Sequence, residues 1–416
     1  MADDLKKMYR TVMEDHFPEK MELAFGEGKE RKALHYEKVA WVLDGQRTGL
    51  RYGENPGQEA AQYKLVNGNL TLGDVTTIAP GRYLCSDLEL LQSGKHPGKI
   101  NITDADNALN ILRYLGDRPA CAIMKHNNPS GVALGKTLVE AYARANLADR
   151  VAAFGGAIAL NKPCDKPTAE AIAEAYAEVV LAPEFEQGSF EVLAARKNLR
   201  IMRIRNMQKL LEFAPERFLD FKSLIDGGII VQLSFHLEAR TKADLKPAEA
   251  THKGKTYKIK RLPTDREAED LLFGWMVEAG VTSNSVLFVK DLCTVGIGTG
   301  EQDRVGVAEI ARDKAYRKLA DRLCWEKLHT PYNELEDEKQ KREFDAAAAA
   351  RHGGIQGAVM VSDAFFPFRD GTMVGIREGV TAIVQPGGSQ NDHDVIEACN
   401  EHDVAMVFTG QRSFKH

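Results

Sequence analysis

Short apolar runs of strand length alternate with segments of helical periodicity over most of this chain. Ala120–Met124 and Ser285–Val289 are such runs, and apolar residues recur at helical spacing in Leu138–Ala145 and Val305–Leu319. This alternation favours layers of helices on sheets whose strands are mostly parallel. We expect further strands at Glu178–Leu181, Ala358–Val361, Thr381–Gln385 and Val404–Thr409. Gly228–Leu233 is a further apolar run. We expect further helices at Phe190–Lys197 and Leu271–Ala279.

The length of 416 residues is too great for one ordinary hydrophobic core and suggests two or three domains. We expect a polar, helix-rich extension at residues 1–48 and a first α/β unit at 49–238. A polar and basic connection at 239–266 then leads to a second α/β unit at 267–416. Residues 331–350 are typical of an exposed, charged helix.

Charge and composition exclude several classes of protein. A hydrophobic fraction of 44% and a charged fraction of 28% are those of a globular protein, and a net charge of −5 provides no bulk positive field for nucleic acid. No run approaches the roughly 18 apolar residues of a membrane span, and the start lacks an apolar signal region. The six cysteines form no CxxC pair. We therefore expect a cytoplasmic protein with no nucleic-acid or membrane partner.

The string MKHNNPSG is the most informative local motif. Lys125 and His126 leave an expected strand and enter an Asn-Asn-Pro-Ser-Gly turn, so both side chains should lie at the carboxyl edge of a sheet, where α/β proteins bind ligands. Histidine can take or give a proton near neutral pH, and lysine can donate to developing negative charge. The alternative is an ordinary exposed pair at the end of a strand.

Two glycine-containing strings depart from nucleotide-binding motifs. Gly131–Thr137 has three residues between its glycines where a phosphate loop needs four, which argues against ATP. Gly296–Gly300 lacks the GxGxxG spacing and is interpreted as a glycine-tolerant turn beside a ligand. Arg304 follows at the start of a helix, where an arginine suits an anion or a planar polar group.

Three further strings carry weaker signals. SDAFFPFRDG holds three phenylalanines between Asp363 and Asp370, either as a buried irregular loop or as an aromatic wall with a carboxylate at its rim. RYGENPGQ places Arg51 and Tyr52 before a turn, and the terminal residues follow a predicted strand.

The H-x-E…P-C-x-x-C signature of zinc deaminases and the HExxH signature are missing, so no catalytic zinc is expected.

Together these strings resemble one family. RYGENP, KHxNPxG, AFGGAIALN, EVVLAPEF, LLFGW, SNSV, VGIGxGxxxR, SDAFFPFRDG, TAIVQPGGS and FTGxRxFxH occur in the order found in the AICAR transformylase family, over residues 49–416. That family is usually the C-terminal half of a bifunctional purine-biosynthesis protein. It transfers a formyl group from 10-formyltetrahydrofolate, the co-substrate, to the 5-amino group of AICAR and gives FAICAR.

The resemblance implies a pair of cytidine-deaminase-like α/β units without catalytic zinc, and a homodimer with active sites at the subunit interface. The residues before the RYGENP motif are too few for the family's IMP cyclohydrolase domain. A stand-alone transformylase is therefore expected, with a separate IMP cyclohydrolase as a candidate partner. Two alternatives stay open: a catalytically degenerate AICAR-binding paralogue that partners such a cyclohydrolase, and a zinc-type nucleobase deaminase.

The resemblance also implies roles for single residues, and Lys125 and His126 are the expected catalytic pair. Gly57 departs from the family, which usually has His there, and Ser130 replaces a Cys or Ala. A structural potassium ion is possible near Asp363. The cations Arg51, Lys125, Arg304 and Arg412 imply one local positive cleft. AICAR is expected at Arg51, Tyr52, Gly155, Glu178, Asn284, Arg304, Phe365, Arg412, Phe414 and His416, and the folate at Phe154, Val305, Pro367 and Asp370.

Overall fold

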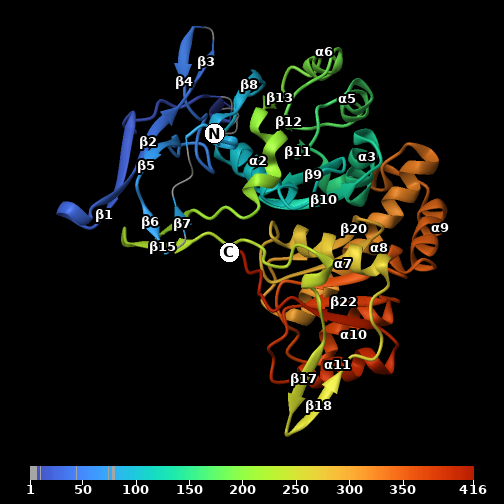
Figure 1. Cartoon of the computed structure of the whole chain (residues 1–416). Helices are drawn as coiled ribbons and strands as arrows, with labels where there is room; N and C mark the ends of the chain where they lie inside the picture. The colour runs from blue at the N-terminus through green and yellow to red at the C-terminus, as the bar shows by residue number, and fades with distance from the viewer. Residues whose placement is uncertain (1–6, 10, 44, 74, 77–79) are drawn as a thin grey trace. The chain divides into compact units, whose positions relative to one another are not determined.

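The computed structural model describes residues 7–9, 11–43, 45–73, 75–76 and 80–416 (Figure 1). The chain divides into two compact units. The first comprises the chain up to Leu109 together with Ala157–His236, and the second comprises Asn110–Gly156 together with Leu237–His416. The sequence suggested domain limits at residues 48, 238 and 266. Each compact unit of the structure is built from two separate stretches of chain, so those domain limits stay predictions.

The first unit contains a small antiparallel sheet and a parallel one. Strands β1, β2 and β5 pair antiparallel, whereas β11, β12 and β13 pair parallel and β8 joins β13 antiparallel. Its elements are β1 Lys20–Phe25, β2 Lys32–Val39, β3 Trp41–Leu43, β4 Gln46–Thr48, β5 Gln62–Gly68, β6 Thr71–Leu72, β7 Val75–Thr76, β8 Glu89–Gln92, α2 Lys99–Leu112, β11 Ala157–Leu160, α5 Lys166–Ala173, β12 Val179–Ala182, α6 Ser189–Ala194, β13 Arg200–Arg203, β14 Leu219–Ser223 and β15 Ile229–Leu233.

The prediction of a helix-rich segment at residues 1–48 is wrong for the described part of it. From Lys20 to Thr48 the chain forms strands β1 to β4. In β1 the residues alternate between exposed and half-buried, which is the period of a strand with one covered face. Leu23 opposes Leu34 across the β1–β2 ladder, so this alternation, rather than the polar composition, decides the local structure.

The second unit holds a mixed sheet of order β9-β10-β20-β19-β21-β22-β23-β16. The pairs from β9 to β21 are antiparallel, and β21, β22 and β23 are parallel. The expectation of mostly parallel strands is therefore wrong here, although the α/β class is confirmed. The elements are β9 Ala120–Lys125, β10 Asn128–Leu134, α3 Leu138–Ala148, α4 Arg150–Ala153, β16 Lys246–Pro247, β17 Glu249–His252, β18 Lys255–Lys258, α7 Asp265–Glu278, β19 Ser285–Lys290, β20 Cys293–Thr299, α8 Arg304–Leu328, α9 Glu338–Ala349, β21 Val359–Ser362, α10 Arg369–Arg377, β22 Ala382–Gln385, α11 Asp392–Glu401 and β23 Ala405–Phe408.

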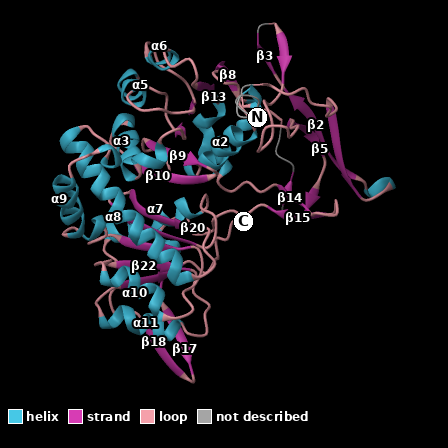
Figure 2. Cartoon of the chain, turned by 180° about the vertical axis from the view of Figure 1, so that it is seen from behind, coloured by secondary structure: helices cyan, strands magenta, loops and turns pink. Residues whose placement is uncertain are grey.

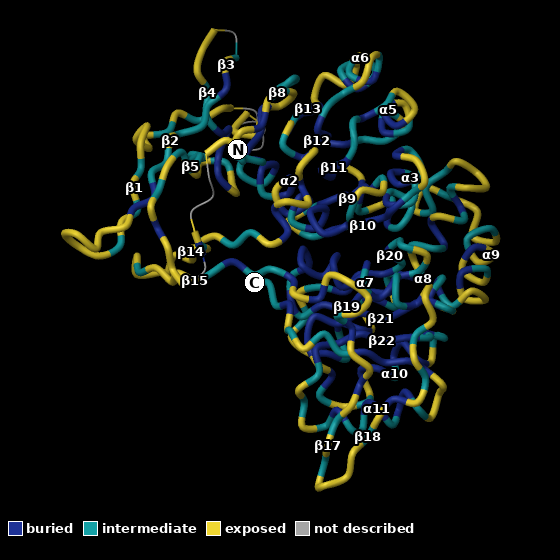
Figure 3. Tube along the Cα trace, in the orientation of Figure 1, coloured by how far each residue is buried: buried dark blue, intermediate teal, exposed yellow. Residues whose placement is uncertain are grey.

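Helices cover both faces of this sheet (Figure 2). A methyl group added to Gly274 of α7 would lie 3.1 Å from Val289 and 2.5 Å from Val361. A methyl group on Gly375 of α10 would meet Met360, the residue before Val361, at 2.7 Å. Since successive residues of a strand point to opposite faces, α7 and α10 lie on opposite sides. Figure 3 shows the strands between them as the most buried part of this unit.

The pattern of two strands followed by a helix occurs twice in the second unit, as β9-β10-α3 and as β19-β20-α8. In both cases a glycine of the second strand lets the helix approach closely. A methyl group on Gly131 would lie 2.0 Å from the carbonyl oxygen of Ala145, and one on Gly298 would lie 2.1 Å from that of Val307. The string Gly296–Gly300 is thus mainly strand, and the predicted turn begins only at Gly300, where φ is +71°.

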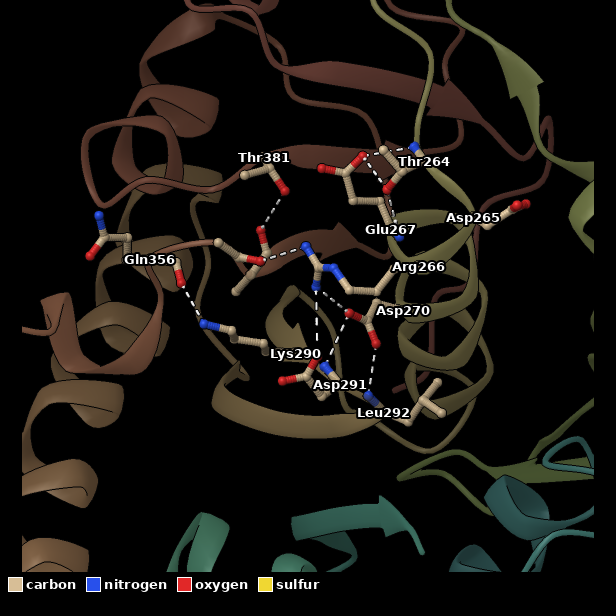
Figure 4. A network of polar contacts seen from close by, with 12 residues as sticks. Thr264, Asp265, Arg266, Glu267, Asp270, Lys290, Asp291, Leu292, Gln356 and Thr381 are labelled. Carbon is tan, nitrogen blue, oxygen red and sulfur yellow. Dashed lines mark hydrogen bonds and ion pairs between the residues drawn. The ribbon is translucent and has the colours of Figure 1, made fainter. Parts of the chain in front are cut away.

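A buried carboxylate holds the turn between β19 and β20 (Figure 4). Asp291 and Leu292 both have positive φ, and their backbone N–H groups donate to Asp270 at 3.0 and 2.7 Å. Asp270 is 1% exposed, and burial raises its pKa, although Arg266 donates to it at 3.0 Å. The turn is thereby fixed in the left-handed conformation that a two-residue hairpin needs.

Two predicted segments take more structure than the sequence indicated. Residues 239–266 were expected as a connection, but they form the edge strand β16 and the hairpin β17–β18. The charged helix expected within 331–350 is confirmed as α9, which buries only Phe344 and Ala348. No helix in the described ranges has the combination of length and apolar composition that crossing a bilayer requires.

Candidate functional site

A two-residue turn presents the predicted catalytic pair. β9 ends at Lys125, and β10 begins at Asn128, which pairs with Lys125 across the hairpin. His126 and Asn127 form the turn, with φ of +55° and +60°. The longer Asn-Asn-Pro-Ser-Gly turn expected from the sequence is therefore wrong, because Asn128–Leu134 is strand. The tight turn places His126 at the tip of the hairpin, where its side chain is exposed.

The two side chains of the pair differ in their surroundings. Lys125 Nζ donates a 2.8 Å hydrogen bond to the carbonyl oxygen of Phe154, an exposed residue just before Gly155, where φ is +74°. Within the described part of the chain no hydrogen bond holds the His126 imidazole. The lysine is thus oriented by the backbone, whereas the imidazole is free to turn toward a bound molecule.

Asn128 fixes the hairpin against the next segment of the unit. Its side-chain oxygen accepts hydrogen bonds from Thr282 N at 2.8 Å and from Thr299 Oγ1 at 3.2 Å. The residues that follow Thr282 include Asn284, another predicted site residue. Asn128 of the hairpin is therefore hydrogen-bonded to Thr282, two residues before Asn284.

Arg304 stands at the centre of a buried network. It opens α8, is 8% exposed, and its Nη2 donates to Asn284 Oδ1 at 2.8 Å. Its Nη1 pairs with Asp363 and also donates to Ser285 O at 3.2 Å and to Ser362 Oγ at 3.1 Å. Nη1 and one N–H of Nη2 thus already serve the protein, and the assignment of Arg304 to an anion or a planar polar group such as AICAR stays a prediction. Arg304 positions Asn284 and Asp363.

Two carboxyl groups are buried beside this arginine. Asp363 Oδ2 accepts from Ser283 Oγ at 2.6 Å and from Ser285 N at 3.2 Å. Glu278 accepts from Ser285 Oγ at 2.6 Å, and its other oxygen has no hydrogen-bond partner among the described residues. Burial, followed by the nearby charge of Asp363, raises the pKa of Glu278 well above its ordinary value. The sequence reasoning missed Glu278, because a single acid in a helical pattern carries no signal of its own.

The C-terminal residues are tied to this network. Ser413 N donates to Asp363 O at 2.9 Å, and Lys415 and Ser283 exchange two hydrogen bonds of 2.9 and 3.1 Å. Ser413 is buried, whereas Arg412 and His416 are exposed at the surface. There the Arg412 guanidinium lies 4.1 Å from the Phe414 ring centre, and the Phe414 and His416 rings lie 5.5 Å apart. The three predicted tail residues are therefore in contact, with the Arg412 guanidinium near the Phe414 ring and the His416 ring edge-on to it.

The tail also links the hairpin tip to the phenylalanine-rich segment. Lys415 Nζ donates to Asn127 O at 3.2 Å, and Ser413 holds Asp363, which opens that segment. Of the predicted aromatic wall, Phe366 is fully buried, and its N–H donates to Gln385 Oε1 at 2.7 Å. Phe365 is partly exposed, Pro367 and Val305 are half-buried, and Asp370 is exposed in the first turn of α10. The structure thus leaves the predicted folate residues accessible.

The remaining predicted residues lie in the first unit. Arg51 and Tyr52 are buried rather than exposed, with the Arg51 guanidinium 4.5 Å from the Tyr52 ring centre. Arg51 Nη1 donates to Tyr9 O and Lys95 O at 3.1 and 2.9 Å. Glu178 is half-buried and pairs with Arg200 at 3.2 Å.

Arg200 is a further residue that the sequence reasoning missed. Its side chain is 1% exposed, and it donates to His96 O at 3.3 Å as well as to Glu178. Burial lowers the pKa of Arg200, and burial likewise lowers that of His96. The sequence did offer a signal for Arg200, because it stands as a basic residue at the start of an apolar strand, in the string RIMR. Its role is to hold the Glu178 carboxylate.

Metal binding was tested on the described residues. Within them, no three His, Cys, Asp or Glu side chains gather closely enough to hold a metal ion. The assignment of single residues to AICAR or folate stays a prediction.

The chain matches one known family over most of its length. The family model described as "AICARFT/IMPCHase bienzyme" matches residues 6–314. The "Bifunctional purine biosynthesis protein PurH" of Cereibacter sphaeroides is 40% identical over 371 residues, which is 88% of this chain and 59% of that protein. Proteins of the same name from Dinoroseobacter shibae and Persephonella marina are 40% and 38% identical, with the same coverage. The chain thus spans 59% of the length of these curated relatives.

Proposed function

This chain belongs to the AICARFT/IMPCHase bienzyme family, and from that premise we propose that it acts in purine biosynthesis as a formyltransferase. The donor is 10-formyltetrahydrofolate, the acceptor is the 5-amino group of AICAR, and the product is FAICAR. The observation that carries the proposal is the exposed His126 imidazole beside Lys125, on a hairpin joined by hydrogen bonds to the tail and to the segment that holds Asn284. Because the chain spans 59% of its relatives' length, the proposal covers the transformylase step alone.

The chemistry requires help at three atoms. The acceptor amine is attached to an electron-poor imidazole, so its lone pair is delocalised and it is a poor nucleophile. A bond forms between the amine nitrogen and the formyl carbon, the bond from that carbon to folate N10 breaks, and the amine proton ends on N10. An oxyanion exists in between, and it needs a hydrogen-bond donor.

The catalytic pair supplies these functions. His126 takes the amine proton, and help of this kind is typically worth about 10²–10⁴-fold in rate. Lys125 donates to the oxyanion or to N10, for which a preorganised donor is worth about 10²–10³-fold. Its present acceptor, the Phe154 carbonyl, keeps the ammonium in place until substrate binds. Holding both substrates in register supplies the rest.

The proposal includes a homodimer, and an exposed hairpin supports it. Among the described strands, β14 and β15 pair with each other and with no other strand, and Ile225, at the turn between them, is fully exposed. A two-stranded hairpin with exposed apolar side chains is marginal alone. We assign a second copy of the chain as the partner. The exposed members are Phe218, Phe221, Leu224, Ile225, Ile229, Ile230 and Val231.

A potassium ion near Asp363 is compatible with the residues present. Hard cations take carboxylate, hydroxyl and carbonyl oxygens, and such oxygens gather around Ser285, where Glu278 keeps one oxygen without a hydrogen bond among the described residues. A bound cation would stabilise the ionised forms of Glu278 and Asp363. The melting temperature should then be higher in potassium chloride than in tetramethylammonium chloride at equal ionic strength.

A spectrophotometric assay of tetrahydrofolate release tests the proposed reaction. Release should depend on AICAR, and formate or another folate in place of the donor should give no product. If AICAR binds but release is the same with and without it, the chain is a degenerate AICAR-binding paralogue. Stoichiometric zinc would instead favour a deaminase. A pull-down with IMP cyclohydrolase tests the predicted partner separately.

A further inference from the structure

A buried arginine connects two of the residues that are predicted to bind AICAR. The side chain of Arg200 is 1% exposed, and its Nη1 donates to Glu178 Oε2 at 3.2 Å. Its Nη2 donates to the carbonyl oxygens of Lys95 and His96 at 3.4 and 3.3 Å. The Lys95 oxygen also accepts from Arg51 Nη1 at 2.9 Å. Two guanidinium groups thus meet at one carbonyl oxygen, and all of these residues belong to the first unit.

The Glu178 carboxylate is held in one direction by three donors. Arg200 and Asn101 both donate to Oε2, Asn101 at 3.5 Å, and the Asn101 amide is fixed because its oxygen accepts from Gly98 N at 3.0 Å. Burial raises the pKa of Tyr176, and the charge of Glu178 and a hydrogen bond between the two side chains add to the rise. An ionised carboxylate can accept about four hydrogen bonds, and the Glu178 side chain is 36% exposed. Glu178 therefore keeps room for a donor on a bound molecule.

A rigid turn carries the carbonyl groups that receive the two arginines. His96 has a φ of +48° and is 4% exposed. Burial lowers the pKa of His96, so its imidazole is neutral near neutral pH. Its Nε2 donates to Gly49 O at 2.6 Å, which leaves Nδ1 to accept from Ser93 Oγ at 3.0 Å. The turn is thus fixed on both sides of the ring, so its carbonyl groups stay directed at Arg51 and Arg200.

The charges in this cluster are unequal. Arg51 and Arg200 are both buried, and each keeps an Nε without a hydrogen-bond partner among the described residues. Burial and the charge of Arg51 lower the pKa of Arg200, whereas Glu178 opposes the shift. A phosphate that binds at Arg51 would be repelled by a carboxylate in the same cluster. Arg200 offsets this repulsion, because its positive charge lies directly on the Glu178 carboxylate.

On the basis of the proposed function, we propose that Arg200 is a positioning residue of the AICAR site, which holds Glu178 as an acceptor and cancels its charge so that the phosphate of AICAR can bind at Arg51. AICAR carries an anionic phosphate at one end and hydroxyl and amino donors elsewhere. A carboxylate suits the donors but repels the phosphate, so the two requirements conflict within one site. The pair of Arg200 and Glu178 resolves the conflict, since it presents an acceptor with little net charge. The site therefore prefers the nucleotide over the corresponding nucleoside.

The test compares AICAR with its riboside, which lacks the phosphate, and measures the ratio of their affinities by equilibrium binding. Arg200→Gln should lower the ratio of AICAR to riboside affinity about tenfold, the order expected when one charge near a partly buried anion is removed. Glu178→Gln should raise the ratio, and the double substitution should return it close to the wild-type value. Arg200→Lys keeps the charge and should keep the ratio. Arg203→Gln, at the other arginine of β13, is the matched control and should leave the ratio unchanged, because Arg203 pairs with Glu89 and Glu184.

Steady-state kinetics provide a second measurement. Arg200→Gln should raise the KM for AICAR about tenfold, the effect expected for a lost charge-assisted hydrogen bond. The kcat and the KM for 10-formyltetrahydrofolate should stay within a few-fold, since Arg200 acts on the nucleotide through Glu178.

Two results would overturn this role. One is a wild-type ratio in Arg200→Gln, and the other is a double variant whose ratio is no higher than that of Arg200→Gln, as for an arginine that only supports the fold. If Arg200→Gln does not fold, Glu178→Gln alone decides, because an unchanged ratio there would mean that its charge does not reach the phosphate. If the wild type binds AICAR but transfers no formyl group, the proposed function fails and the ratios still decide the role of Arg200. A wild type that does not bind AICAR rejects both.

Discussion

Nη2 of Arg304 donates a 2.8 Å hydrogen bond to the side-chain oxygen of Asn284. This contact fixes the orientation of the Asn284 amide, whose nitrogen donates to Gln302 O at 3.0 Å and keeps a second N–H. Asn284 therefore presents a donor of defined direction. If AICAR binds here as proposed, Arg304 acts on it by orienting Asn284.

Arg304→Lys should separate this positioning role from a simple need for charge. A lysine cannot serve Asn284, Asp363, Ser285 and Ser362 together, so the amide loses its orientation. We expect the KM for AICAR to rise about tenfold and the free energy of unfolding to fall by about 3 kcal/mol, as for a broken buried pair. Arg322→Lys, at an exposed i,i+4 pair, is the control. Steady-state kinetics and urea unfolding measure both effects, and an unchanged KM would remove Arg304 from substrate positioning.

His126→Asn should abolish transfer without harming the fold. Asparagine tolerates the left-handed backbone of the turn better than histidine does. We expect kcat to fall at least about 10²-fold, the KM for AICAR to stay within a few-fold, and the melting temperature to stay the same or rise. Asn127→Gly should keep kcat and stabilise the hairpin by about 1 kcal/mol. A wild-type kcat in His126→Asn would exclude the imidazole as the base.

Replacing apolar residues of the β14–β15 hairpin should dissociate the proposed dimer. Ile225→Asp combined with Ile229→Asp introduces charge where the side chains are 108% and 59% exposed in the single chain. Sedimentation should show monomers, and specific activity should fall if the site requires both subunits. Val42→Asp, at an apolar residue 74% exposed on β3, should leave the assembly intact. A dimer that survives the double substitution would place the interface elsewhere.

Glu267→Gln should change how stability depends on pH. Glu267 is buried, which opposes ionisation, yet bonds from Arg261, Thr381 and Thr264 lower its pKa from 4.5 to about 2. A lowered folded-state pKa stabilises the protein above the unfolded value, and this contribution is lost as pH falls through about 2. The wild type should exceed the variant by about 3 kcal/mol at pH 7, and the difference should shrink below pH 4.5.

Chemical unfolding at several pH values measures this difference. Glu269→Gln provides the same substitution at a residue whose carboxylate pairs with Arg118 and is 42% exposed. It should show a small difference at every pH, because exposed pairs contribute little. A gap between wild type and Glu267→Gln that stays constant from pH 7 to pH 3 would contradict the assigned role of the Arg261 pair.

The central elements were predictable because burial leaves a strong trace in sequence. Ala120–Met124 and Ser285–Val289 are uninterrupted apolar runs, and both form buried strands. The stripe in Val305–Leu319 likewise marks α8, which extends nine residues further, to Leu328. Strand direction was not predictable in the same way, since β19 and β21 are antiparallel although both read as buried runs.

The site was predictable only in part, because its polar residues act through tertiary contacts. The strings around Lys125 and Asp363 were recognised, but nothing local indicates that Arg304 and Asp363 pair in the interior. The hairpin turn was missed because His126 and Asn127 adopt positive φ without a glycine. The N-terminal strands were missed because their polar composition hides the alternation of exposed and half-buried residues, which β1 shows at every second position. Gly228–Leu233 is an apolar run in the sequence, yet most of the strand Ile229–Leu233 within it is exposed.

The backbone conformation of His126 carries a practical consequence. With φ at +55°, the position favours Asn or Gly over a branched aromatic ring. If His126 is the proposed base, laboratory evolution scored on heat resistance or expression alone would enrich those replacements at the cost of activity. Each round of selection for stability would then need a parallel screen for the proposed formyl transfer.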